Sequence, residues 1–155
     1  MDRKQKLLGE ILIEKSLITP EQLKSALEEQ VTTKEFLGAI LIGRRYIQEV
    51  DLLKALSEQF NIPFIKLRDK YIDWELVKQF SSSLILDYKC IPIKKDDYSI
   101  TIALTNPLDA WLLKKAEEEA KGLNVKMVLA SQADIQEVIE RYKQYMRRHI
   151  SDLFK

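Results

Sequence analysis

The sequence is poor in the residues from which most catalytic and metal sites are built. It has one cysteine, Cys90, and one histidine, His149, among 155 residues. A zinc site needs three or four ligands that are usually rich in these two residue types, so no metal site is predicted. A nucleophile activated by histidine would depend on His149, which lies in a basic segment near the C-terminus, so an enzyme is not expected. A single cysteine cannot form an internal disulfide, which fits a reducing cytoplasm.

Other absences narrow the class of protein further. Lys and Arg number 25 against 24 Asp and Glu, a net charge of +1, so no nucleic-acid partner is predicted. No apolar run reaches about 18 residues, and Glu10 and Glu14 interrupt the N-terminal segment that a signal peptide would need. Direct membrane insertion is therefore not expected. The four glycines and four prolines form no linker, and 46% apolar residues predict a globular chain.

What the sequence does contain is an internal repeat with an offset of 29 residues. Leu7–Gln30 aligns with Phe36–Gln59, and eleven of 24 positions are identical. In each copy, apolar residues recur at helical spacing on both sides of a turn, which predicts two short helices. Residues 1–60 are therefore predicted to form a four-helix unit.

The second helix of the first copy has a clear start signal. Thr19 can cap the helix, Pro20 suits its first position, and Gln22 can complete a capping box. In the second copy Gln48 stands where Thr19 stood, which predicts a weaker cap.

The glycines of the repeat leave two interpretations open. Gly9 and Gly38 occupy the same repeat position, and glycine within a helix costs about 0.5–1 kcal/mol relative to alanine. Either two helices approach closely there, or the backbone approaches a ligand.

Gly38 to Arg44 has the spacing of a phosphate-binding loop, but its middle residues are apolar or small. Arg44 and Arg45 replace the required Lys and Ser/Thr, so ATP binding is not expected.

After residue 60 the pattern changes to alternating strands and helices. Strands are predicted at Ile62–Leu67, Cys90–Lys94, Ser99–Leu104 and Asn124–Ala130. Helices are predicted at Asp73–Phe80, at Ser83–Tyr88, from the cap Asn106 and Pro107 to about Lys121, and after Ser131. The predicted fold is α+β. A four-helix tandem-repeat subdomain (1–60) precedes a small α/β subdomain of three or four strands with helices on one side (61–147) and a basic tail (148–155).

These motifs together resemble the N-terminal region of type II secretion and type IV pilus assembly ATPases, the GspE and PilB families. The repeat is similar to the tandem motif called the MshEN domain, R-L-G-x-x-L-x-x-x-G-x-L-x-x-x-x-L-x-x-x-L-x-x-Q, present twice with a five-residue spacer. The later part resembles the following subdomain, through Asn61–Phe64, Ile91–Ile93, Ile102–Asp109 and Ala130–Ile135.

In that family the paired motif can bind cyclic di-GMP, with apolar side chains on the guanines. The positions that match the motif are Leu8, Gly9, Leu12, Ile18, Leu23, Leu27 and Gln30, and then Leu37, Gly38, Leu41, Ile47, Leu52, Leu56 and Gln59. The leading arginine of the motif is replaced by Leu7 and Phe36, and its second glycine by Ser16 and Arg45. A charge-assisted contact is thereby absent from both copies, unless Lys6, Arg44 or Arg45 supplies it.

The resemblance implies a non-catalytic docking and regulatory domain, because no ATPase core occurs in these residues. The expected partners are the inner-membrane platform of the secretion or pilus machinery and an ATPase core in cis or in trans. The alternative is a sensor domain for cyclic di-GMP, and no other cofactor is implied. The expected location is the cytoplasm, peripheral to the inner membrane through the partner.

Overall fold

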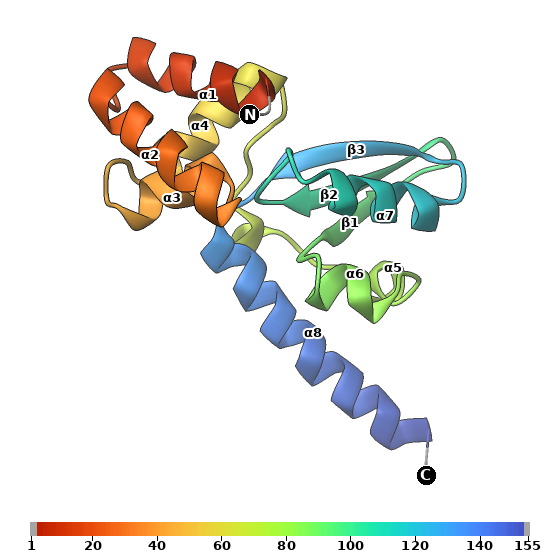
Figure 1. Cartoon of the computed structure of the whole chain (residues 1–155). Helices are drawn as coiled ribbons and strands as arrows, with labels where there is room; N and C mark the ends of the chain where they lie inside the picture. The colour runs from red at the N-terminus through yellow and green to blue at the C-terminus, as the bar shows by residue number, and fades with distance from the viewer. Residues whose placement is uncertain (1–2, 154–155) are drawn as a thin grey trace. The chain divides into compact units, whose positions relative to one another are not determined.

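The computed structural model describes the backbone of residues 3–153 and the side chains of residues 7–150. The chain divides into two compact units, Met1–Ile62 and Pro63–Lys155. The first unit is entirely helical, and the second combines helices with one sheet, so the chain is α+β (Figure 1).

The first unit contains four helices: α1 (Arg3–Glu14), α2 (Pro20–Thr33), α3 (Leu37–Gly43) and α4 (Glu49–Phe60). Helix α1 packs against α4, and α2 packs against α3. The capping box at α2 is present, because the Gln22 amide donates to Thr19 Oγ1 (3.1 Å) and the Thr19 amide donates to Gln22 Oε1 (2.9 Å). Helix α4 has no side-chain cap at Gln48, as the sequence predicts. The predicted spacer is partly helical, since α2 continues to Thr33.

The turns that end α1 and α3 have the same geometry. Ser16 and Arg45 both adopt the left-handed conformation, with φ of 58° and 62°. The Ser16 amide donates to the Ile13 carbonyl (2.9 Å) and the next amide to the Leu12 carbonyl (3.0 Å), and the second copy repeats both bonds at Ile42 and Leu41. This is the Schellman arrangement, whose left-handed position usually holds glycine. The second glycine of the family motif falls at these two positions, so the turn explains it without a ligand.

The second unit is built on a three-stranded sheet in the order β1-β2-β3. The strands are β1 (Ile91–Lys95), β2 (Ser99–Leu104) and β3 (Asn124–Leu129), with β1 antiparallel and β3 parallel to the central β2. Helix α7 (Ala110–Ala120) forms the crossover between the parallel strands and contacts β3. Ile100 and Ile102 on β2 are buried, with 1% exposure each.

Three short helices precede this sheet in the chain. They are the 3₁₀ helix η1 (Leu67–Asp69), α5 (Trp74–Val77) and α6 (Ser82–Leu86), with α5 beside β1 and α6 beside α7. The predicted strand at Ile62–Leu67 was wrong: only Phe64 forms a bridge, with Leu129, before η1 begins. The Leu129 amide donates to the Pro63 carbonyl, and the Ile65 amide donates to the Leu129 carbonyl. The segment therefore pairs with a single residue of β3.

The predicted cap of α7 was also wrong. Asp109 is the cap and accepts from the Leu112 amide (3.0 Å), whereas Asn106 accepts from the Leu108 amide (2.9 Å) in the preceding turn. The two polar residues satisfy different backbone donors, and the later one begins the helix.

The last helix, α8 (Gln132–Leu153), is anchored near its start by an ion pair. Asp134 is 4% exposed, and its carboxylate accepts from Arg68 Nε (2.7 Å) and from the Arg68 amide (3.2 Å). Burial raises the pKa of Asp134, but the hydrogen bonds from Arg68 outweigh it and leave the pKa below its ordinary value. The helix continues through residues 148–153, which the sequence predicts as a tail.

Candidate functional site

The two repeat glycines lie beneath leucines of the following helix. A Cβ atom built on Gly9 would lie 2.7 Å from Leu23 Cδ1, and one on Gly38 would lie 2.6 Å from Leu52 Cδ2 and 2.7 Å from Phe36 Cε1. Such distances are too short for carbon atoms, so each glycine allows a leucine to pack directly against its helix. This favours close packing of helices over approach to a ligand.

Most positions that match the cyclic di-GMP motif lie in the interior. Ten of the fourteen are buried: Leu8, Gly9, Leu12, Ile18, Leu37, Gly38, Leu41, Ile47, Leu52 and Leu56. Gln30 and Gln59 are half-buried, as are Leu23 and Leu27. Only the first repeat therefore presents motif leucines at the surface; their equivalents Leu52 and Leu56 are 3% and 0% exposed.

The half-buried Leu23 and Leu27 line an apolar groove on α1 and α2. Its lining residues are Ile13, Pro20, Leu23, Lys24, Leu27, Glu28 and Val31, around a volume of about 350 Å³. Leu23, Leu27 and Val31 follow one another at intervals of four residues, which places them along one side of α2. Val31 is 75% exposed. Val31 falls in the five-residue spacer between the repeats, although it lies four residues after Leu27 and so continues the helical spacing of the two leucines.

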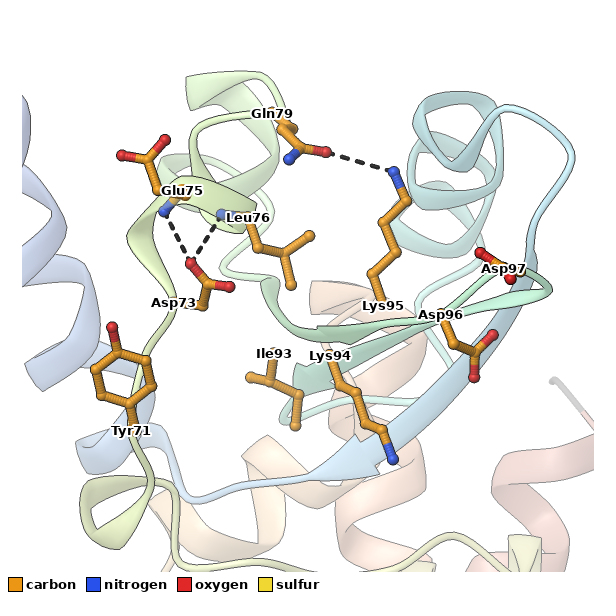
Figure 2. A pocket seen from close by; sticks show the side chains of 10 residues that line it. All are labelled: Tyr71, Asp73, Glu75, Leu76, Gln79, Ile93, Lys94, Lys95, Asp96 and Asp97. Atoms are coloured by element: carbon orange, nitrogen blue, oxygen red, sulfur yellow. Dashed lines mark hydrogen bonds between the residues drawn. The ribbon is translucent and has the colours of Figure 1, made fainter.

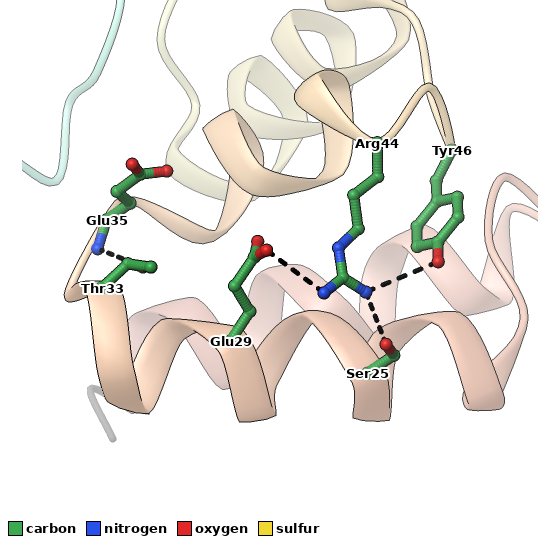
Figure 3. Close-up of polar contacts among 6 residues, drawn as sticks. All are labelled: Ser25, Glu29, Thr33, Glu35, Arg44 and Tyr46. Atoms are coloured by element: carbon green, nitrogen blue, oxygen red, sulfur yellow. Dashed lines mark hydrogen bonds and ion pairs between the residues drawn. The ribbon is translucent and has the colours of Figure 1, made fainter.

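Arg44 does not face this groove but connects α3 to α2 (Figure 3). Its guanidinium donates to Glu29 Oε1 (3.2 Å), to the Ser25 hydroxyl and to the Tyr46 hydroxyl (3.5 Å). The hydrogen bonds with Tyr46 and Glu29 raise the pKa of Arg44 further above its ordinary value. Arg44 is thus engaged in structural contacts rather than free to replace the missing motif arginine.

Arg45 and Lys6 are the two other cations that could replace the motif arginine. Arg45 is exposed and lines a separate hollow of about 500 Å³ with Leu17, Ile42, Tyr46, Ile47, Gln48 and Asp51. Its side chain has no hydrogen bond or ion pair within the described part of the chain. The side chain of Lys6 lies outside the described residues. Leu7, at the position of the motif arginine, is 43% exposed.

The second unit has an open groove between α5 and the β1–β2 hairpin, with a volume of about 580 Å³ (Figure 2). Several of its polar groups serve the fold. Asp73 accepts from the Glu75 and Leu76 amides and caps α5, and Lys95 donates to Gln79. Asp96 accepts from two backbone amides of the hairpin, which lower its pKa.

The remaining candidates for chemistry are also accounted for. Gly38 to Arg44 forms helix α3 and its cap, so no phosphate loop occurs there. Cys90 is buried, and burial raises the pKa of its thiol to about 12, so it is not a thiolate nucleophile. His149 is exposed on α8 with Nδ1 2.9 Å from the Tyr145 carbonyl oxygen. Among residues 3–153 there is no cluster of His, Cys, Asp or Glu able to hold a metal, and no helix long and apolar enough to span a membrane.

A helical repeat followed by a small mixed sheet is a fold that solved structures share. The structure of MshE with cdg superposes with a TM-score of 0.79 at 24% identity, over 87% of this chain and 97% of that one. The N-terminal domain of XpsE gives a TM-score of 0.72 at 18% identity, over 92% of this chain and 97% of that one.

The family model of the MshEN domain matches residues 60–149, and the chain belongs to this family. The resemblance to the tandem motif lies in residues 1–60 of the sequence, whereas the family model matches the residues that follow. The type IV pilus assembly ATPase PilB of Myxococcus xanthus is 30% identical over 138 residues, and PilB of Thermus thermophilus is 32% identical over 115. These matches cover 87% and 73% of this chain. The chain spans only 24% and 13% of those two relatives.

Proposed function

We propose that this chain is a non-catalytic docking and regulatory domain of a type II secretion or type IV pilus assembly ATPase, and that it binds the cytoplasmic part of the inner-membrane platform. The observation that carries the proposal is the apolar groove of α1 and α2. The similarity to PilB supports the assignment to such a motor, and the lack of a catalytic constellation among the described residues supports a binding role.

The chemistry of the groove favours a protein partner. Leu23, Leu27 and Val31 line the groove along one side of α2, the kind of surface against which the apolar face of a partner helix packs. The charged groups among its lining residues are Lys24 and Glu28, of opposite sign and one helical turn apart. Such a surface buries apolar side chains well but offers few donors to a phosphate or a guanine edge.

A substitution in the groove tests this proposal without disturbing the core. Val31→Glu places a charge on the groove, and Val50→Glu makes the same change at an exposed valine of α4 outside it, 41% exposed. Burying a valine contributes about 1.5–3 kcal/mol, so Val31→Glu should weaken binding at least tenfold. Calorimetry with the purified cytoplasmic domains of the platform proteins of the same organism measures this. Equal affinities of the two variants would contradict docking through the groove.

The second candidate is a cyclic di-GMP sensor. It is favoured by the similarity to the fold of MshE, whose structure contains cdg, and by Leu23 and Leu27, which remain open to a ligand. Against it stand the loss of the leading arginines and the structural engagement of Arg44. Two charge-assisted hydrogen bonds contribute about 3–6 kcal/mol together, so their loss costs two to four decades of affinity. We therefore expect weak binding or none.

Calorimetry with cyclic di-GMP separates the two functions. Leu7→Arg restores one arginine at a half-exposed site, whereas Phe36→Arg also removes a ring that packs near Gly38. The single variant Leu7→Arg is therefore the cleaner test, and the double variant follows it. Improved binding in Leu7→Arg would support an intact scaffold that lacks only its charge. Tight binding by the wild type would overturn our order of preference and point to Lys6 or Arg45.

A further inference from the structure

The apolar stripe of α8 continues beyond the part that its own unit covers. Ile135, Val138, Ile139 and Tyr142 are buried, with exposures of 3% or less. The same side of the helix continues at Met146, which is half-buried, and at Ile150, which is 49% exposed. Figure 1 shows the last turns of α8 extending past the other elements of the unit.

Aromatic contacts cover only one flank of the C-terminal part of α8, residues 141–150. Tyr145 stacks on Trp74 of α5 with ring centroids 5.4 Å apart, and His149 lies on Tyr145 at 3.9 Å. The Tyr145 hydroxyl also donates to Glu75 Oε1 (3.5 Å). The helix is thereby held against α5 as far as Tyr145, while Ile150 stays at the surface.

The charges of the segment are all of one sign. Residues 141–150 contain the cations Arg141, Lys143, Arg147 and Arg148 and no carboxylate. Arg141 lies over the Trp74 ring at 5.8 Å, and Lys143 pairs with Glu140 at 3.3 Å. Within the described residues, no hydrogen bond or ion pair engages the Arg147 or Arg148 side chain. Cations near a helix C-terminus complement its dipole, but Arg141 and Lys143 lie more than two turns before Leu153.

We propose that this cationic surface, Lys143–Ile150, binds an acidic amphipathic helix of a protein partner. A second copy of the same surface would bring Lys143, Arg147 and Arg148 against the same three cations, which is unfavourable. A lipid surface would require a broad apolar face, and here two apolar side chains are uncovered. An acidic helix can instead place its apolar side chains on Met146 and Ile150 while its carboxylates pair with Arg147 and Arg148.

Nuclear magnetic resonance of the ¹⁵N-labelled full chain tests the proposal. The probe is a synthetic helical peptide of about 18 residues with leucines at helical spacing and glutamates elsewhere, beside a matched peptide in which lysines replace the glutamates. We expect amide shifts confined to Lys143–Ile150 with the acidic peptide, weakened by added salt. The basic peptide should produce none.

Charge reversal gives the second part of the test. Arg147→Glu with Arg148→Glu should weaken peptide binding on the order of tenfold or more, whereas Lys66→Glu with Lys70→Glu, the same charge change at exposed lysines, should not. Equal binding of the two peptides, or equal effects of the two double variants, would overturn the proposal. So would binding of phosphatidylglycerol vesicles in place of the acidic peptide, or a dimer that Ile150→Ser dissociates.

Discussion

Replacing Ser16 or Arg45 with glycine should stabilise the first unit. Both residues occupy the left-handed position of a Schellman turn, with φ of 58° and 62°. That conformation costs a residue with a Cβ about 1–2 kcal/mol, whereas glycine adopts it freely but loses about 0.4–1 kcal/mol more entropy on folding. The difference leaves a gain of about 0.5–1 kcal/mol at each turn. The two turns belong to separate copies, so the gains should add in the double variant.

The assay uses the distribution of tryptophan along the chain. Trp74 and Trp111 both belong to the second unit, so tryptophan fluorescence follows that unit, while far-ultraviolet circular dichroism also follows the helices of the first. For a unit of about 60 residues, a gain of about 1 kcal/mol raises the melting temperature by about 4–8 °C. We expect the circular-dichroism transition of Ser16→Gly to shift upwards while the fluorescence transition stays in place.

Exposed helical positions supply the matched controls. Glu14 ends α1 and Ala39 lies within α3, and both are exposed. Glycine at either position should destabilise by about 0.5–1 kcal/mol, because it lowers helix propensity without relieving a left-handed turn. A loss of stability in Ser16→Gly as large as in Glu14→Gly would refute the reasoning.

Three further predictions concern other parts of the chain. Gly38→Val should destabilise by about 1–3 kcal/mol through overpacking against the buried Leu52, and an unchanged melting temperature would refute close packing. The ion pair of Asp134 should contribute its full stability above about pH 4, the pKa of aspartate in an unfolded chain. That stability should be lost as pH falls through the lower pKa of Asp134 in the folded state. Unfolding curves of Asp134→Asn against pH should lack that decline. Limited proteolysis should cut first between Phe60 and Asp73, and primary cuts inside α2 or β2 would contradict that boundary.

Local signals in the sequence predicted local structure well. The capping box of Thr19 and Gln22 satisfies donors within one turn of helix, so the residues alone specify it. The choice between Asn106 and Asp109 was harder, because both are good caps and three residues apart. The strand predicted at Ile62–Leu67 reduces to a bridge at Phe64 because its pairing depends on where β3 ends.

The candidate binding groove shows where sequence reasoning fails. The two copies of the repeat share their apolar pattern, so the pattern alone does not distinguish Leu23 and Leu27 from Leu52 and Leu56. In the structure the first pair is half-exposed and the second pair is buried. Exposure depends on the packing of the whole unit, which no single copy of the repeat encodes. The left-handed turns were likewise hidden, since serine and arginine stand where glycine would have marked them.

The unequal burial of α2 and α4 gives the two copies different tolerance to mutation. Leu52, Leu53, Ala55 and Leu56 of α4 are all buried, so most changes there create a cavity or overpack the core. On α2 only Ala26 is buried, and the opposite flank can change with little loss of stability. A duplicated segment of this kind can retain its fold through one copy while the other acquires new binding specificity.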